Sequence, residues 1–297
     1  MDLEAKRKFL LENLEEVYTK IRKWEKYIGP GIKRKIQRLL SLPEIYIPYV
    51  YLSILKPKNF RFSLFNKRKI SLDINDRESA LLSTFKCLHQ ISEYKLIKFL
   101  IKNLHSEDIF YDIGGNYGFY TYLALEFCRE VHYFEPLPYV FENVRRNLQH
   151  EVKVHLNNIA LSSESGEITM YFDQVYSGRS TIIPKVGKSL GKINEIKVQA
   201  LTLDEYIRTN TKPTTLKMDV EGAEAKVIDG GINFLQTNSP IIAMEVWGGE
   251  KREIALVAVK KLRQLGYKLY YIDLNGDIVQ TNDCPFSEEG DNFIFMK

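Results

Sequence analysis

The sequence predicts an α/β protein built around one mostly parallel β-sheet, and two observations support this fold class. From residue 109 onward, short apolar runs alternate with segments of helical periodicity, which is the pattern of repeated βα units. The last two predicted strands, 267–272 and 292–296, have no helix between them, and Asn275-Gly276 is a turn signal. We therefore expect a doubly wound sheet of seven strands whose last strand is antiparallel, preceded by a helical extension.

The pattern assigns an element to most of the chain after residue 109. Strands are expected at 109–113, 131–135, 152–158, 214–218, 240–246, 267–272 and 292–296. Helices are expected at 118–130, 137–149, 222–236 and 250–265. Residues 159–200 interrupt the alternation with two β-like runs, 167–172 and 195–200, around a polar loop. They predict an inserted hairpin over one edge of the ligand-binding face.

Charge divides the chain into two parts. Residues 1–69 carry 17 lysines and arginines and 7 acidic residues, a net charge of +10. The remaining residues carry 25 lysines and arginines and 31 acidic residues. We expect a basic helical extension over 1–60 and the main domain over 61–297. Three scattered cysteines match no metal-binding spacing and suit a reducing compartment. With no secretory signal, and apolar runs too short to span a bilayer, the sequence predicts a cytoplasmic protein.

The extension begins with an apolar seam of helical spacing. Its residues are Leu10, Leu14, Val17, Ile21, Trp24 and Ile28. Such a seam needs a partner, and three are open: the chain's own domain, a second copy, or a lipid surface. The near-heptad spacing favours a homodimer, while the flanking lysines favour peripheral contact with acidic lipid. A hairpin at 60–64 and 70–74 and helical spacing over 77–103 follow.

The first predicted strand ends in a glycine-rich loop, where open α/β sheets bind ligands. Asp112 is followed by Gly114, Gly115, Asn116 and Gly118. Glycines let the backbone approach a ligand closely. Because Asn116 stands where a dinucleotide fold usually has its second glycine, the loop favours a ligand without phosphates.

The next two strands offer further ligand-binding groups at the same edge. Glu135, 21 residues after Gly114 and followed by Pro136, has the spacing of an acid that accepts hydrogen bonds from a ribose diol. Asn158 and Ile159 follow the third strand and could meet an adenine edge and face. An alternative is that Asn158 is simply a turn former.

Acidic residues gather after the fourth and fifth strands. Asp219, Glu221 and Glu224 follow the fourth strand, and Glu245 lies at the end of the fifth. Helix capping is a sufficient explanation of Glu224. None of the five histidines lies after these strands, so the candidate catalytic residues are Asp219, Glu245 and Glu221. Asp219 and Glu245 could also hold Mg²⁺, although no dedicated metal site is predicted.

The order of these motifs resembles the FkbM family of methyltransferases over roughly residues 70–297. The matching stretches are Asp112 to Thr121, Phe134 to Pro138, Ala160 to Ser162 with Gly166, Thr202 to Asp204 and Lys217 to Glu224. The resemblance implies a Rossmann-like class I methyltransferase fold and S-adenosylmethionine-dependent O-methylation, often of a sugar, glycan, glycolipid or natural product. It adds Tyr120, Thr121 and Asp219 to the expected cofactor-binding residues. The family usually has alanine where Gly115 stands.

Two other classes of function remain open from the sequence. A nicotinamide-dependent oxidoreductase could use the same sheet, but Asn116 and the terminal hairpin disfavour it. A non-catalytic protein that binds a membrane or a partner would not need intact cofactor motifs. Because the chain lacks an Asn-Pro-Pro-aromatic motif, a nucleic-acid acceptor is not expected.

Overall fold

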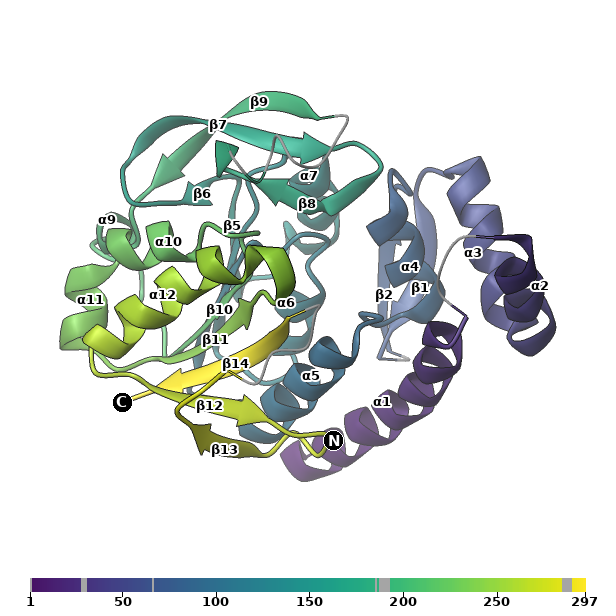
Figure 1. The fold of residues 1–297 in the computed structure, drawn as a ribbon, viewed down its shortest axis with the longest axis horizontal. Helices are drawn as coiled ribbons and strands as arrows, with labels where there is room; N and C mark the ends of the chain where they lie inside the picture. Colours follow the sequence, from purple (N-terminus) through teal and green to yellow (C-terminus); the bar gives the residue numbers. More distant parts are fainter. Residues whose placement is uncertain (1, 28–30, 66, 185, 187–192, 285–289) are drawn as a thin grey trace. The chain divides into compact units, whose positions relative to one another are not determined.

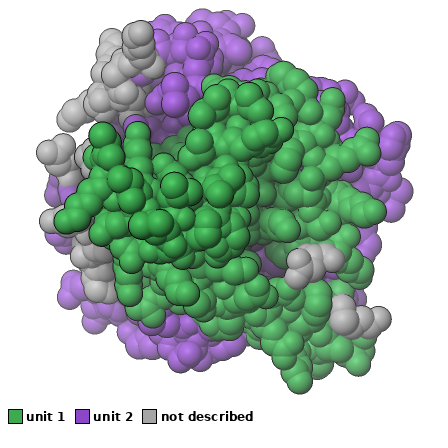
Figure 2. Space-filling view, turned by 90° about the vertical axis from the view of Figure 1, so that its right-hand side faces the viewer, with its two compact units in different colours: residues 1–94 green, residues 95–297 purple. Residues whose placement is uncertain are grey.

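The computed structural model describes residues 2–27, 31–65, 67–184, 186, 193–284 and 290–297. They form two compact units, residues 1–94 and 95–297 (Figure 2). The predicted boundary was 60/61. The first unit extends further because Leu81 and Phe85 of a later helix pack into the same apolar cluster as Ile21 and Trp24 of the first helix.

The larger unit is built on an eight-stranded sheet in the order β13-β12-β14-β11-β10-β3-β4-β5 (Figure 1). Its strands are β3 (Ile109–Ile113), β4 (Glu130–Phe134), β5 (Val154–Asn157), β10 (Thr215–Met218), β11 (Ile241–Val246), β12 (Lys268–Ile272), β13 (Ile278–Thr281) and β14 (Asp291–Met296). The first five are parallel, and β14 is antiparallel to β11. This strand order confirms the predicted Rossmann-like fold class.

One strand of the sheet was not predicted. The turn at Asn275-Gly276 joins β12 to β13, and β14 lies between β11 and β12. The turn packs against helix α5 (Ile91–Asn103), whose Lys98 Nζ donates to the Leu274 carbonyl at 3.2 Å. A side chain at Gly276 would lie 2.6 Å from Lys98 Cβ, so this position requires glycine.

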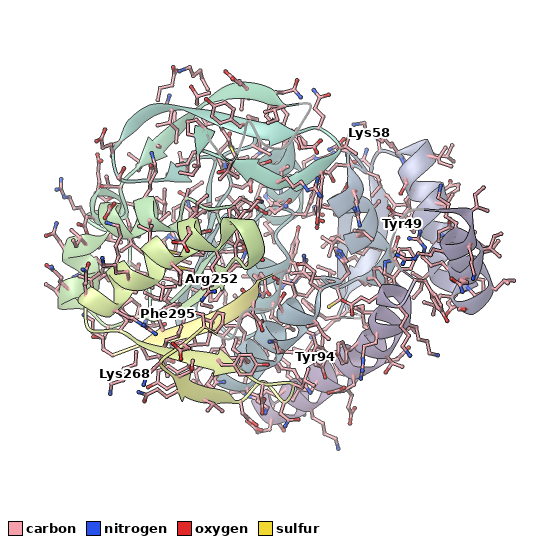
Figure 3. All side chains as sticks on the ribbon, in the orientation of Figure 1. Tyr49, Lys58, Tyr94, Arg252, Lys268 and Phe295 are labelled. Carbon is pink, nitrogen blue, oxygen red and sulfur yellow. The ribbon has the colours of Figure 1, made fainter. Side chains whose placement is uncertain are left out.

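Helices cover the sheet at the four predicted places, but the first ends at Ala124, the predicted helix 222–236 is two helices, and the short helix Leu203–Tyr206 was not predicted. The helices are α6 (Phe119–Ala124), α7 (Pro138–Leu148), α9 (Leu203–Tyr206), α10 (Glu224–Gly230), α11 (Ile232–Thr237) and α12 (Arg252–Gln264), the last preceded by the short helix η1 (Gly249–Lys251). Buried residues of α9 to α12 form one apolar core with Tyr111, Met218 and Phe295 of the sheet. Phe295 on β14 is labelled in Figure 3. Asp112 and Lys217 are buried against α6, where Thr121 and Tyr120 contact them.

The segment that interrupts the alternation forms a second sheet of its own. It contains β6 (Ala160–Leu161), β7 (Gly166–Asp173), β8 (Tyr176–Thr181) and β9 (Asn194–Leu201), in the order β6-β9-β7-β8. The predicted runs 167–172 and 195–200 correspond to β7 and β9, which pair antiparallel from Gly166 to Phe172. The insertion is therefore a four-stranded sheet rather than a single hairpin.

A buried histidine lies on β4 under helix α9. His132 Nδ1 lies 2.7 Å from the Tyr206 hydroxyl, and its Nε2 lies 2.8 Å from Glu130 Oε1. His155 of β5 stacks on the same ring at 4.3 Å and also contacts Glu130. Burial lowers the pKa of His132 to about 4, so its ring is neutral in the folded protein at neutral pH.

We expect mild acid to destabilise the protein through His132. Its pKa rises on unfolding toward about 6.5, so the unfolded chain binds the proton first. The free energy of unfolding is therefore highest above about pH 6.5 and falls as the pH drops toward about 4. Between about pH 7 and pH 5 the expected loss is about 2 kcal/mol. Hydrogen bonds from His132 and Thr211 outweigh burial and lower the pKa of Glu130, so that carboxylate does not titrate in this window.

Chemical denaturation at each pH measures this effect. The His132→Gln variant should show a smaller pH dependence of its unfolding free energy, whereas His150→Gln, at an exposed position, should keep that of the wild type. An unchanged pH dependence in His132→Gln would assign the effect to another group.

The smaller unit is mainly helical. Its elements are α1 (Leu3–Glu25), α2 (Ile32–Ser41), α3 (Pro43–Leu55), β1 (Phe60–Leu64), β2 (Arg68–Leu72), α4 (Arg77–Phe85) and the first turn of α5. The predicted hairpin is present, with Phe60 opposite Leu72. The helical pattern over 77–103 forms two helices, because Lys86 adopts a left-handed conformation and ends α4.

The apolar seam of α1 is buried within the chain. Leu10, Leu14, Ile21 and Trp24 are at most 6% exposed. The Trp24 ring meets Tyr49 of α3 and Phe85 of α4 edge-on. This burial removes the argument that the seam requires a second copy, so the homodimer has no support from it. Ile28, the last residue of the seam, lies outside the described residues.

No helix in the described part of the chain is long and apolar enough to cross a membrane.

Candidate active site

The site forms where the carboxyl ends of β3, β4 and β10 meet. Ile113 is paired with Phe134 on one side and with Met218 on the other. The amides of Gly114 and Gly115 both donate to the Phe134 carbonyl, at 3.1 and 3.0 Å. A side chain at Gly114 would lie 2.0 Å from the Asp219 carbonyl oxygen, so glycine is required for the loop to pass between the two strand ends.

The departure from the family pattern at Gly115 has a local explanation. A Cβ atom there would lie 2.5 Å from the Tyr133 ring. That ring instead fills the space, and its hydroxyl donates to the carbonyl of Asn116. Asn116 itself has a left-handed backbone, with φ of 44°. Tyr133 and Gly115 thus act together to hold the loop in a conformation that non-glycine residues rarely adopt.

A cavity of about 660 Å³, solvent mouth included, opens beside this loop. The main sheet contributes Ile113, Gly114, Asn116, Phe134, Glu135, Pro136, Leu137, Ile159, Asp219, Val220, Glu221 and Ala223. The inserted sheet contributes Ala160, Leu161, Met170, Ser177, Gly178 and Ser180, followed by Ile182. The cavity is therefore mostly apolar, with a few polar groups at the strand ends.

Glu135 is the most deeply placed acid of the cavity, with only 6% of its surface exposed. Its two oxygens accept hydrogen bonds from the amides of Leu137 at 2.8 Å and Asn116 at 3.0 Å. These bonds fix the carboxylate but leave lone pairs for a ligand. Burial raises the pKa of Glu135 to about 7, even though both amides act to lower it. The sequence indicated this residue from its spacing to Gly114.

A buried lysine, which the sequence analysis did not single out, connects the two aspartates of the site. Lys217 of β10 is 4% exposed and is paired in register with Asp112 of β3. Its Nζ donates to Asp219 Oδ2 at 3.2 Å and lies 5.0 Å from the centre of the Tyr120 ring. Burial raises the pKa of Asp112, and the Lys217 charge partly offsets this rise. A lysine inside an otherwise apolar strand was the signal that could have revealed it.

The candidate catalytic acids differ in their positions. Asp219 and Glu221 line the cavity, and Glu221 has a left-handed backbone with φ of 52°. Glu245 is not among the cavity-lining residues, and its Oε2 accepts from Trp247 Nε1 at 3.1 Å. Glu224 accepts from the amides of Val220 and Gly222, which agrees with a capping role. Asp219 is therefore the best-placed candidate base.

The arrangement gives no support to a magnesium ion between Asp219 and Glu245, since each carboxylate is bonded to a different neighbour. Among the described residues, the donor atoms of Glu130, His132 and His155 gather within 4.8 Å of one another. Glu130 begins β4, at the opposite end of that strand from Glu135. The two imidazole rings stack in nearly parallel planes, so their in-plane lone pairs do not converge on one ion.

The predicted cofactor-binding residues fall into two groups. Six line the cavity: Gly114, Asn116, Glu135, Pro136, Ile159 and Asp219. The other six are Asp112, Gly115, Gly118, Tyr120, Thr121 and Asn158, which the cavity does not include. Several of these shape the loop instead: Thr121 donates to Asp112 at 2.7 Å, and Asn158 donates to the carbonyls of Glu135 and Pro136.

The inserted sheet covers the cavity from the other side. Met170 of β7 and Ser177 and Ser180 of β8 line it. The Ser177 hydroxyl lies 3.3 Å from Asn116 Oδ1, which connects the insertion to the glycine-rich loop. The insertion therefore contributes residues that no motif in the sequence revealed.

The FkbM methyltransferase domain model matches residues 112–269, a segment that runs from the glycine-rich loop to β12 and covers just over half of the chain. The chain belongs to the FkbM methyltransferase family. Its relatives include the hexuronic acid methyltransferase AglP of Haloferax volcanii, at 25% identity over 160 residues. This match covers 53% of the chain and 63% of the length of AglP.

Solved methyltransferase structures show a partial similarity. The FkbM methyltransferase from Methylobacillus flagellatus has a TM-score of 0.41 at 12% identity, over 71% of this chain and 56% of that one. Fibrillarin from Aeropyrum pernix, solved with natively bound S-adenosyl-L-methionine, has a TM-score of 0.40 at 13% identity. The match covers 68% of this chain and 74% of that one.

Proposed function

We propose that this FkbM-family methyltransferase uses S-adenosylmethionine to methylate a hydroxyl group, and that its acceptor is a sugar. The observation that carries the proposal is the placement of Glu135. This buried carboxylate at the end of β4 faces a mostly apolar cavity and accepts one backbone hydrogen bond at each oxygen from the described residues. Such a group suits the two hydroxyls of a ribose.

The other cavity residues fit the remaining parts of this cofactor. Ile159 and Leu137 offer apolar surface for an adenine ring, while Glu221 offers negative charge for the ammonium group of the amino-acid end. Asn116 in the loop suits a ligand without phosphates better than a dinucleotide. When bound, S-adenosylmethionine supplies an activated methyl group on its sulfonium.

Asp219 is placed to accept the proton of the acceptor hydroxyl. Lys217 Nζ holds Asp219 Oδ2 at 3.2 Å, so the other oxygen, Oδ1, is the one that takes the proton. A sugar hydroxyl is a weak nucleophile, and a positioned base compensates for this. The inserted sheet lines the cavity with Met170 and Ser177, which are placed to orient the acceptor.

A sugar acceptor is proposed from the family and from AglP, whose name states that it methylates hexuronic acid. The cavity presents Ser177 and Ser180 from β8 beside the acids of the main sheet. Serine hydroxyls and carboxylates together suit a polyhydroxylated ligand. The acceptor is expected to enter between the inserted sheet and the end of β10.

Titration calorimetry with S-adenosylmethionine and with NAD tests the cofactor. We expect saturable binding of S-adenosylmethionine and none of NAD. Binding of NAD alone would replace the proposal with an oxidoreductase. Methyl transfer from labelled cofactor to uronic acid glycosides, with mass analysis of the product, tests the acceptor separately.

Cofactor affinity should rise with pH through about 7. Ribose hydroxyls donate to the ionised form of Glu135, whereas burial keeps the pKa of the free site at about 7. Below this pKa, Glu135 must lose a proton when the cofactor binds. The affinity should therefore fall about tenfold for each unit by which the pH is lowered. Asp112 and Lys217 are the other charged groups that act on Glu135. Calorimetry from about pH 6 to pH 8 checks this, and Glu135→Gln should remove the dependence.

A further inference from the structure

Helix α2 turns its apolar face to solvent. Its large apolar residues are Ile32, Ile36, Leu39 and Leu40, at the spacing of a single helix face. Their exposed fractions are 75%, 49%, 41% and 76%. None of the ten residues of α2, all of them described, is buried. A helix that only covers its own protein turns its apolar face inward, so α2 has the opposite orientation.

A charged residue holds α2 to the rest of its unit. The Arg38 guanidinium lies over the ring of Trp24 at 5.0 Å and over that of Tyr46 at 5.3 Å. Arginine stacks well on aromatic rings because its planar cation is weakly hydrated. The inward contact of α2 is therefore made by a cation, and its apolar residues remain on the outside.

Helix α3 extends this exposed apolar surface. It packs beside α2 and buries only Ile45 and Leu52 of its thirteen residues. Ile47, Tyr51, Ile54 and Leu55 are each more than half exposed. We name these four residues and the four of the neighbouring helix α2 the α2–α3 apolar surface. These eight residues are half of the sixteen large apolar residues that are exposed in the described chain.

Positive charge surrounds this surface. Besides the inward-facing Arg38, residues 32–58 hold five lysines and arginines and one acid, Glu44. Lys33 and Lys35 are exposed on α2 itself, between its apolar positions. An apolar face with basic flanks matches a bilayer with acidic headgroups. It does not match a second copy of the chain, which would bring the same positive charge to the interface.

We propose that the α2–α3 apolar surface inserts into the headgroup region of an anionic lipid bilayer. The two helices are 10 and 13 residues long, so they lie in the plane of the interface and do not span it. Apolar burial and the attraction of lysines to acidic lipid both contribute. This inference goes beyond the methyl-transfer reaction and does not depend on its cofactor or acceptor.

Vesicle flotation with the full chain tests the proposal. The vesicles contain phosphatidylcholine alone or an equimolar mixture of phosphatidylcholine and phosphatidylglycerol. We expect the protein to float with the mixed vesicles, more weakly with neutral ones, and less as salt rises. The triple variant Ile32→Gln, Leu40→Gln and Ile54→Gln should bind the mixed vesicles on the order of tenfold less, or weaker still.

A matched control removes three exposed apolar residues elsewhere. Val152→Gln, Leu274→Gln and Val279→Gln change side chains that are 93%, 51% and 58% exposed in the larger unit. This control should float like the wild type. Circular dichroism verifies that both triple variants are folded.

Three results would overturn the proposal. The wild type could fail to float with mixed vesicles at low salt, or the α2–α3 triple variant could float as well as the wild type. In the third, light scattering would find that the wild type is a dimer and the α2–α3 triple variant a monomer, and neither protein would bind vesicles. The surface would then be an interface between copies.

Discussion

Asp219→Asn should lower turnover by about 10²-fold or more while cofactor affinity changes only a few-fold. The substitution keeps the shape of the side chain and removes the charge of the group that we propose accepts the hydroxyl proton. Asp219 lines the cavity, and Lys217 Nζ holds one of its oxygens at 3.2 Å. The loss should therefore appear in the chemical step. Single-turnover methyl transfer, together with calorimetry of the cofactor, measures the two effects separately.

Glu245→Gln is the matched control for this experiment. Glu245 accepts from Trp247 and does not line the cavity, so its loss should affect turnover far less. If Asp219→Asn keeps full turnover and instead loses stability, Asp219 has a structural role. If Glu245→Gln shows the larger loss, the assignment of the base passes to Glu245.

Local sequence patterns predicted the centre of the sheet well because its strands β3, β4, β10, β11 and β14 are buried along most of their length. Ile109 to Ile113 is buried at every position, which produces an uninterrupted signal of this kind. The ends of such strands then placed Glu135 and Asp219 at one edge of the sheet, because parallel strands share the direction of their carboxyl ends. The same rule predicts the positions of both acids from the sequence alone.

Features that depend on distant pairing were not predictable in the same way. The place of β14 between β11 and β12 is decided by pairing across the sheet. Lys217 is buried because Asp112, more than 100 residues earlier, and Asp219 lie beside it. The inward role of Arg38 depends on the rings of Trp24 and Tyr46. Periodicity alone would have placed the apolar face of α2 inward.

The largest loss of cofactor affinity is expected for Glu135→Ala. Each charged hydrogen bond lost should cost about 1.5–3 kcal/mol, and a ribose diol makes two of them. The side chain also fixes the amides of Asn116 and Leu137, so part of the loss will come from the loop. Glu135→Gln retains the shape of the side chain and one carbonyl acceptor. Its cofactor affinity should therefore lie between those of Glu135→Ala and the wild type. Calorimetry measures the three affinities, and thermal unfolding checks each fold. Unchanged affinity in a folded Glu135→Ala protein would remove Glu135 from the cofactor site and, with it, the observation on which S-adenosylmethionine binding was proposed.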